Sequence, residues 1–126
     1  MNSDVIFFFT QHMDALPLYE KLEEQILAQI PDVKIRTAKT QITFANKRGF
    51  ACVSFNPCRK AADRPAIWIT LTFGLAYRKD SPRVDASTEP YPGRWTHHVM
   101  LGSIDEIDEE LMDWLMEAAA FSAWKR

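Results

Sequence analysis

Two stretches of the chain repeat apolar residues every three to four positions, the spacing of one face of an α-helix. The first begins after Asp14, a residue type that caps helices, and ends before Pro31 and Asp32. Pro17 falls in its first turn, where proline is tolerated. The apolar positions are Leu18, Tyr19, Leu22, Ile26, Leu27 and Ile30. We expect a helix here, led into by a helical turn at residues 5–9.

The second stretch lies near the end of the sequence. Ser103 and Glu106 fit a capping box, in which each side chain bonds the other residue's backbone N–H. Acidic residues crowd the first turns, and Lys125 and Arg126 stand at the end, an arrangement that suits the helix dipole. The apolar stripe is Ile104, Ile107, Leu111, Trp114, Leu115, Ala118 and Phe121. These features predict a C-terminal helix.

Between the helices the apolar period shortens to two, which is typical of β-strands. The pattern predicts five strands, at residues 33–36, 41–44, 50–55, 67–73 and 97–101. Residues 77–95 form a long proline-punctuated segment, within which 83–87 is a candidate for one more strand.

Helix, about five strands and helix define an α+β fold. Short turns between strands favour an antiparallel sheet, and two amphipathic helices can cover one of its faces. We therefore expect a two-layer sandwich with a roughly five-stranded, mainly antiparallel sheet. No internal repeat or linker divides the sequence, so residues 1–126 are expected to form a single domain.

Strand alternation predicts which residues lie on the face away from the helices. That face is polar and rich in hydroxyl groups, and Trp68 is its one tryptophan. Its members are Lys34, Arg36, Gln41, Thr43, Cys52, Ser54, Trp68, Thr70, Thr72, His98 and Met100. A tryptophan beside threonines and arginines is a plausible stacking platform for a ligand, and an ordinary solvent face is the alternative.

The composition is typical of a globular protein and argues against a membrane partner. Of the 126 residues, 47% are apolar and 25% charged, and no stretch approaches the ~18 apolar residues of a membrane span. The apolar run at residues 5–9 is too short for a signal-peptide core. We expect a cytoplasmic protein without a membrane partner.

The charges are unevenly distributed along the sequence. Residues 33–100 hold twelve basic and four acidic residues, a net charge of +8, whereas residues 1–32 and 101–126 each carry −5. A basic sheet region would attract anions such as phosphates, nucleotides, nucleic acid or an acidic protein surface. The alternative is that the basic residues lie on scattered loops and only keep the surface soluble.

No motif announces a metal, a cofactor or a reaction. Cys52 and Cys58 are six residues apart, which is neither Cys-x-x-Cys nor a zinc spacing. His97 and His98 should point to opposite sheet faces and therefore not chelate one ion. The four glycines include no Gly-x-Gly phosphate loop. We expect no cofactor and no metal, and we expect Arg94 and both histidines to share one corner.

Several segments together resemble a known family. They are Lys39 to Phe44, Lys47 to Ala51, Asp80 to Arg83, Gly93 to His98 and Asp105 to Trp114. In this order they resemble the bacterial family catalogued as domain of unknown function 5655, over nearly the whole chain. The resemblance implies a small bacterial cytoplasmic domain and supplies no mechanism. Its signature positions fall on Lys39, Gln41, Arg48, Arg94, His97 and His98. Ala118 to Ala120 depart from the Ala-Tyr or Ala-Trp pattern that the family would have there.

Three functions stay open. The first is a non-enzymatic binding module for an anionic ligand or nucleic acid. The second is a small enzyme that uses His97 or His98 as acid–base and Arg94 as anion anchor. The third is a protein–protein interaction or homodimerisation domain. The ligand contacts expected for the first are Arg36, Lys39, Gln41, Arg48, Trp68, Arg94, His97 and His98.

Overall fold

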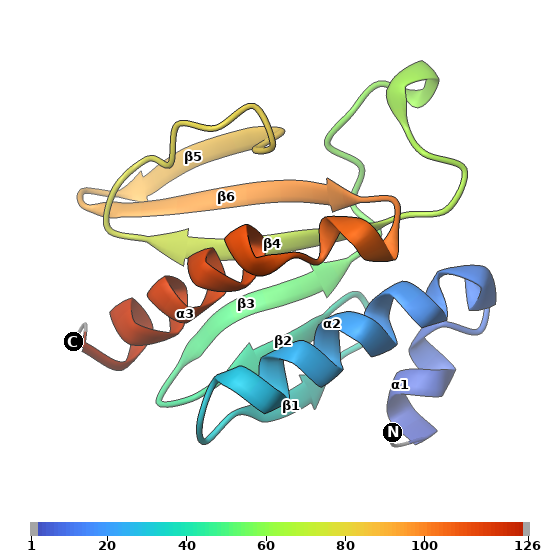
Figure 1. The fold of residues 1–126 in the computed structure, drawn as a ribbon, viewed down its shortest axis with the longest axis horizontal. Coiled ribbons are helices and arrows are strands. Elements are labelled where there is room, and N and C mark those ends of the chain that lie inside the picture. The colour runs from blue at the N-terminus through green and yellow to red at the C-terminus, as the bar shows by residue number, and fades with distance from the viewer. Residues whose placement is uncertain (1–2, 125–126) are drawn as a thin grey trace.

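A computed structural model describes residues 3–124 and has two layers, a six-stranded sheet and a layer of helices (Figure 1). The helices are α1 (Ser3–Phe8), α2 (Leu16–Gln29) and α3 (Glu109–Trp124), with short 3-10 turns at Met13–Ala15, Ala61–Asp63 and Ile104–Glu106. The strands are β1 (Lys34–Thr37), β2 (Ile42–Ala45), β3 (Gly49–Ser54), β4 (Ile69–Leu75), β5 (Ala86–Tyr91) and β6 (Arg94–Leu101). The α+β class and the antiparallel sheet are confirmed.

The strands lie in the order β1-β2-β3-β4-β6-β5, and every neighbouring pair is antiparallel. The sheet has one strand more than the five predicted, and this strand lies later in the sequence than the candidate at residues 83–87, which it overlaps only at residues 86 and 87. The additional strand, β5, begins at Ala86 and pairs with β6 at the sheet edge. It is largely exposed and contains Pro90, so it lacks the apolar alternation that marks the other strands. A turn at Pro92 and Gly93, which has φ of +73°, connects it to β6.

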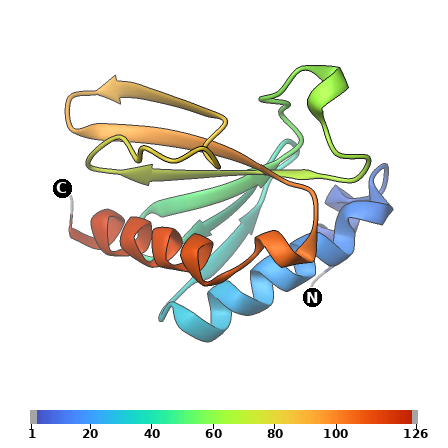
Figure 2. The same cartoon turned by 45° about the horizontal axis from the view of Figure 1, so that its top comes forward.

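The helices cover one face of the sheet (Figure 2). Strand alternation also predicts which residues face the helices. Eight of them are buried in the core: Ile42, Phe44, Val53, Ile69, Leu71, Phe73, Val99 and Leu101. The other three, Val33, Ile35 and Phe55, are partly buried and pack against it. α2 contributes Leu18, Tyr19, Leu22 and Ile26, and α3 contributes Leu111, Trp114, Leu115 and Ala118. The core is thus one continuous layer between the helices and the sheet.

The start of α2 differs from the prediction. Asp14 lies in the 3-10 turn, and no side chain caps either the turn or the helix, which begins at Leu16. The apolar pattern was right about the helix, and the capping assignment was wrong because the preceding turn already supplies a helical backbone. The helix ends at Gln29 and is followed by Asp32, which has φ of +60°.

The predicted capping box exists, but it closes a separate turn. Ser103 and Glu106 bond each other's backbone across the 3-10 turn. A carboxylate oxygen of Asp108 then accepts the Leu111 N–H at 3.0 Å, which caps α3 itself. Lys125 and Arg126 lie outside the described residues.

Among residues 3–124, no helix combines the length and the apolar character that crossing a membrane requires.

Candidate ligand-binding site

The residues predicted to bind a ligand are spread over the sheet. Arg36 and His98 lie on the open face, away from the helices, in a row that continues through Thr43, Cys52 and Thr72. Four strand spacings of about 4.8 Å separate the ends of this row, or roughly 19 Å. The Gln41 amide joins the row by donating to the Thr43 hydroxyl at 3.2 Å.

Four other predicted residues lie at opposite ends of the strands. Lys39 is in the turn between β1 and β2, and Trp68 precedes β4 at the same end of the sheet. Arg48 and Arg94 are at the other end, in the β2–β3 turn and at the start of β6. Trp68 is half-buried and packs edge-on against Phe55, with ring centroids 5.9 Å apart. The eight residues therefore do not form one surface.

The two histidines of β6 occupy opposite faces, as predicted. His97 is fully buried under the helix layer, where its ring stacks on Phe73. Its Nε2 accepts the Lys79 backbone N–H at 2.8 Å, so its proton is on Nδ1. Burial lowers the pKa of His97, and the ring is neutral at pH 7. His98 shares the open face with Arg94, four residues or about 13 Å along the strand, so the three do not meet in one corner.

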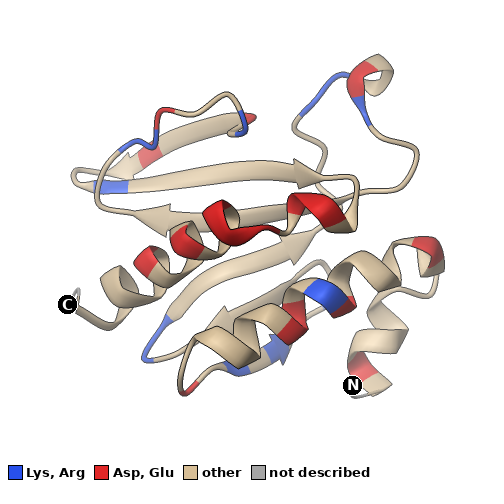
Figure 3. Cartoon of the chain, in the orientation of Figure 1, with Lys and Arg blue, Asp and Glu red and all other residues tan. Residues whose placement is uncertain are grey.

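Many of the basic residues lie on the periphery of the fold (Figure 3). Three of them form ion pairs: Arg59 with Asp85 at 2.8 Å, Lys79 with Glu117 at 3.4 Å, and Arg83 with Asp108 and Glu110 at 2.9 Å. Two of these pairs join the segment after β4 to α3, on the helix side of the molecule. The positive charge of residues 33–100 is therefore not concentrated on the open face.

The β3–β4 loop covers one end of the open face. The Thr70 hydroxyl donates to the Asn56 carbonyl at 2.7 Å, and Arg59 donates to the Met100 carbonyl at 3.2 Å. Ser54, Thr70 and Met100 are buried in consequence. The accessible part of this face is narrower than strand alternation alone suggests.

A polar contact remains in the middle of the open face. The Thr72 hydroxyl lies 2.8 Å from His98 Nδ1, and it also bonds the Cys52 side chain. Burial lowers the pKa of His98 and raises the pKa of the Cys52 thiol. The three groups form a neutral hydrogen-bonded chain at pH 7, which can pass a proton but holds no thiolate. Within residues 3–124, no group of three or more His, Cys, Asp or Glu side chains could hold a metal ion.

A hollow that includes one of the predicted residues, Lys39, lies next to α1. We call it the α1 groove, and its volume is about 500 Å³. It is lined by Phe7, Phe8, Thr10, Gln11, His12, Lys39, Thr40, Phe55 and Asn56. A second hollow of about 350 Å³ adjoins it and shares Phe7, Phe8 and Lys39. The groove thus separates α1 from the β1–β2 turn, with Lys39 on one wall.

Aromatic rings form the other wall of the α1 groove. Phe55 stacks on Phe8 at 5.7 Å and on the His12 imidazole at 4.0 Å, measured between ring centroids. Phe9 lies behind them in the core and contacts Phe8 and Phe55 edge-on. Phe7 stands out from the groove with 80% of its surface exposed. Stacked rings with a buried support give a rigid apolar wall.

The polar groups of the α1 groove are one cation and several hydroxyl and amide groups, which can donate or accept hydrogen bonds. Lys39 is exposed, and Thr10, Gln11, Thr40 and Asn56 bring hydroxyl and amide groups to the same hollow. The adjoining hollow also contains the Asp4 carboxylate. The larger hollow therefore suits a ligand that has an anionic group at one end and a planar or apolar face at the other.

Comparison with protein-family models shows which family the chain belongs to. The family described as "Domain of unknown function (DUF5655)" matches residues 7–122. The chain belongs to the DUF5655 family. Searches of curated proteins and of solved structures give no significant match. The resemblance drawn from the sequence is thereby confirmed.

In this DUF5655 domain, several of the segments that carry the resemblance meet in space. Arg83 of the Asp80–Arg83 segment binds Asp108, and its guanidinium lies 5.6 Å from the Trp114 ring. Trp114 packs against Phe73, on which His97 stacks. This network joins the segment after β4 to α3 and the sheet, so its arrangement is explained by folding and needs no ligand.

No sequence pattern predicts the aromatic wall of the α1 groove in this DUF5655 domain. Phe7 and Phe8 read as part of an apolar run, and Phe55 reads as an inward strand residue. His12 is an isolated histidine between two helical segments. Only Lys39 was singled out. The surplus of aromatics in residues 7–9 was the available signal, because a single short turn can bury only part of such a run.

Proposed function

We propose that this domain is a non-enzymatic binding module that holds a small anionic ligand in the α1 groove. The observation that carries the proposal is that Lys39 and the stacked rings of Phe8, Phe55 and His12 line the same hollow. A hollow of about 500 Å³ lies within the usual range for small-molecule sites, roughly 300–1,000 Å³. The ligand class is a planar aromatic or apolar molecule with a carboxylate or phosphate.

The chemistry of the groove supports this ligand class over a bare anion. Stacking on aromatic faces adds about 0.5–1.5 kcal/mol beyond burial of area, whereas one exposed lysine contributes little by itself because water screens it. Both parts of the ligand are therefore needed for useful affinity. The proposal places the domain in the cytoplasm, in accord with its two free thiols, Cys52 and Cys58.

The proposal is tested by titration of the purified protein with probes that separate the two parts. Adenosine 5′-monophosphate and indole-3-acetate carry both a ring and an anion, indole carries only the ring, and inorganic phosphate only the charge. Isothermal titration calorimetry measures the affinity for each probe, and changes in backbone NMR chemical shifts show where the probe binds. We expect binding of at least one ring-bearing anion, with shifts in residues 7–12 and 39–41, and much weaker binding of indole and phosphate.

Two variants and a matched control sharpen the test. Lys39→Glu should lower the affinity for the probe at least tenfold, which corresponds to about 1.4 kcal/mol, because it replaces electrostatic attraction of the anionic group by repulsion. Phe7→Ala should weaken it by less, since Phe7 stands at the rim. Lys34→Glu makes the same charge change at the other end of β1, on an exposed side chain outside the groove. Equal losses in Lys39→Glu and Lys34→Glu, or no binding of any probe, would overturn the proposal.

Nucleic acid is the polyanion that the basic residues of the open face would favour. Arg36 and Arg94 lie on that face, and several phosphate contacts make affinity fall steeply with salt. Anisotropy with labelled single-stranded and double-stranded oligonucleotides at two salt concentrations covers this case. Tight, salt-sensitive binding that is lost in Arg36→Glu/Arg94→Glu and kept in Lys39→Glu would move the site to the open face.

A further inference from the structure

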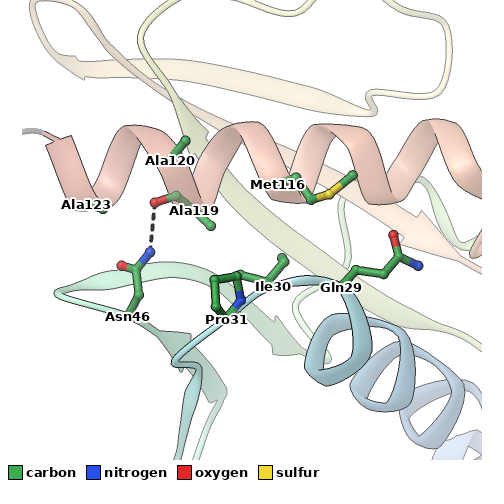
Figure 4. Close-up of a pocket in the computed structure, with 8 residues that line it drawn as sticks. All are labelled: Gln29, Ile30, Pro31, Asn46, Met116, Ala119, Ala120 and Ala123. Atoms are coloured by element: carbon green, nitrogen blue, oxygen red, sulfur yellow. Dashed lines mark hydrogen bonds between the residues drawn. The ribbon is translucent and has the colours of Figure 1, made fainter.

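Another hollow, separate from the α1 groove and the hollow that adjoins it, lies on the helix layer. We call it the α3 groove, and its volume is about 320 Å³ (Figure 4). It runs between the end of α2, the β2–β3 turn and the last turns of α3. It is lined by Gln29, Ile30, Pro31, Asn46, Met116, Ala119, Ala120 and Ala123. The Asn46 amide donates to the Ala119 carbonyl at 2.8 Å and fixes one wall.

The α3 groove is apolar because its α3 side is built mainly of alanines. Ala119 is buried, while Ala120 and Ala123 are exposed along the helix. Large apolar side chains on the same two helices also face solvent. Trp124, one turn beyond Ala120, is 81% exposed, and Met116 on α3 and Leu27 on α2 are exposed as well. An apolar hollow with exposed large apolar side chains on the helices that form it is a candidate interaction site.

The charges around the α3 groove are arranged in two opposite blocks. Lys47 and Arg48 form a basic turn beside the last turns of α3, where the Arg48 carbonyl accepts the Ser122 hydroxyl. The first half of α3 carries the exposed acids Glu109 and Asp113. Figure 3 shows the basic turn at one end of the helix layer and the acidic residues of α3 toward the other. The apolar groove lies at the basic end.

This pattern is complementary to itself. A twofold rotation about an axis perpendicular to α3 reverses the helix direction, so it sets the basic end of one copy against the acidic end of the other. The basic turn lies level with Ser122 on α3, so a rise of about 1.5 Å per residue sets it against the partner's Asp113 when the two helices cross near Met116. Ala119, Ala120 and Ala123 lie to one side of that crossing, where small side chains let two helices approach closely. Both copies use the same patch, as a twofold interface requires.

The edges of the sheet are less suited to pairing. Edge strand β1 is only four residues long and carries the exposed Lys34 and Arg36, and edge strand β5 contains Pro90 and an irregular register. Charged side chains, proline and irregularities are the features that keep edge strands from pairing with other chains. The helix layer is therefore the better surface for association.

We propose that a second copy of this chain covers the α3 groove, forming a twofold dimer in which the two α3 helices cross antiparallel near Met116. The dimer buries Trp124 and Met116 and sets Lys47 and Arg48 of each copy against Glu109 and Asp113 of the other. It leaves the α1 groove of each copy open, and it stands or falls independently of the ligand proposed for that groove.

Light scattering and sedimentation velocity over a range of concentrations test the dimer. The wild type should be a dimer that dissociates on dilution, more readily at high salt because charge pairs contribute. Ala120→Glu should shift the equilibrium to monomer at least tenfold, since it places a charge in the apolar groove, about one helical turn from the crossing point. Ala62→Glu makes the same change on the exposed 3-10 turn of the β3–β4 loop and should leave the equilibrium unchanged. Circular dichroism checks that both variants fold.

Charge reversal tests the orientation of the two copies. Lys47→Glu/Arg48→Glu should weaken the dimer, and so should Glu109→Lys/Asp113→Lys. The chain that carries all four substitutions should recover affinity, because the opposed ends again have opposite sign. A wild type that is monomeric at every concentration would overturn the dimer. Losses that simply add in the four-fold variant would overturn the antiparallel arrangement.

Discussion

At the scale of single residues, His97 and His98 show how one strand gives identical side chains different properties. His97 lies in the core and fixes the backbone of Lys79, whereas His98 lies on the open face beside Thr72. Burial is the main cause of the lowered pKa of both. Their contribution to stability is therefore complete above the pKa of an unfolded-state histidine, about 6.5, and is lost as the pH falls through the lowered native values.

We expect the free energy of unfolding to decrease between pH 7.5 and pH 5. Each histidine contributes a slope of at most about 1.4 kcal/mol per pH unit. Urea unfolding at pH 7.5, 6.5 and 5.5 measures this. His97→Phe keeps the ring stack on Phe73 but removes the acceptor for Lys79, so it should lower stability at pH 7.5 by about 1–3 kcal/mol and flatten the pH dependence.

His98→Gln is the control for that experiment. It should also flatten the profile but cost less at pH 7.5, because its open-face position can still be hydrated. A His97→Phe profile that runs parallel to that of the wild type would show that His97 does not cause the pH dependence. The pKa of Asp108 is lowered by its hydrogen bonds to Arg83 and the Leu111 N–H. Its contribution to stability is therefore lost at a lower pH than that of the histidines, outside the range of this experiment.

Gly102 illustrates a residue whose role only the folded structure reveals. A Cβ atom at this position would lie 2.5 Å from Cγ and 2.7 Å from Cβ of Pro65. We expect Gly102→Ala to destabilise the fold by about 1–3 kcal/mol through displacement of the β3–β4 loop. Thermal unfolding measures the loss. Pro65→Ala removes the clashing ring atom Cγ, so the double variant should recover part of it, and equal losses in both would refute this explanation.

At the scale of elements, the segment between β4 and β5 is held to α3 by several side chains. Arg83 donates to Asp108 and Glu110 and to the Glu106 carbonyl, and Lys79 bonds Glu117. Both cations lie over the Trp114 ring. The segment therefore acts as a strap over the side of the core that α3 leaves uncovered, next to His97.

We expect Arg83→Lys to loosen this strap, since a lysine cannot make the forked contacts of a guanidinium. The loss should be about 1 kcal/mol, and amide hydrogen exchange should quicken in residues 78–85 before the rest of the protein. Arg78→Lys, an exposed position on the same strap, is the matched control. Uniformly faster exchange throughout the chain would mean that Arg83 stabilises the whole fold and not the strap.

The helices and the central strands could be predicted from the sequence because each has an inner apolar face with a regular period. β5 could not, since an exposed edge strand needs no apolar residues and its partner β6 supplies the pairing. The Asp14 cap failed for a related reason: several local structures suit an aspartate, and only the neighbouring turn decides between them. The capping box of Ser103 and Glu106 was predicted correctly because the motif requires two suitable residues at a fixed spacing.

At the scale of the whole molecule, strand alternation assigned the faces correctly but could not bring separate elements together. It placed Lys39 in a turn between two strands without showing that α1 would fold beside that turn and create the α1 groove. The charge count predicted a basic sheet region, yet it could not foresee that Lys79 and Arg83 would pair with acids of α3. Contacts between distant segments are absent from any local pattern.

The position of α3 at the end of the sequence affects how the chain is made. The first four strands are joined in order by turns and loops, so they can pair as they are synthesised, but α3 covers β3 and β4 in the middle of the sheet. At roughly 5–20 residues per second, several seconds separate the completion of β4 from that of α3. During this interval Leu71 and Phe73 remain open to water and to other nascent chains, so slower translation of the second half lengthens the exposure.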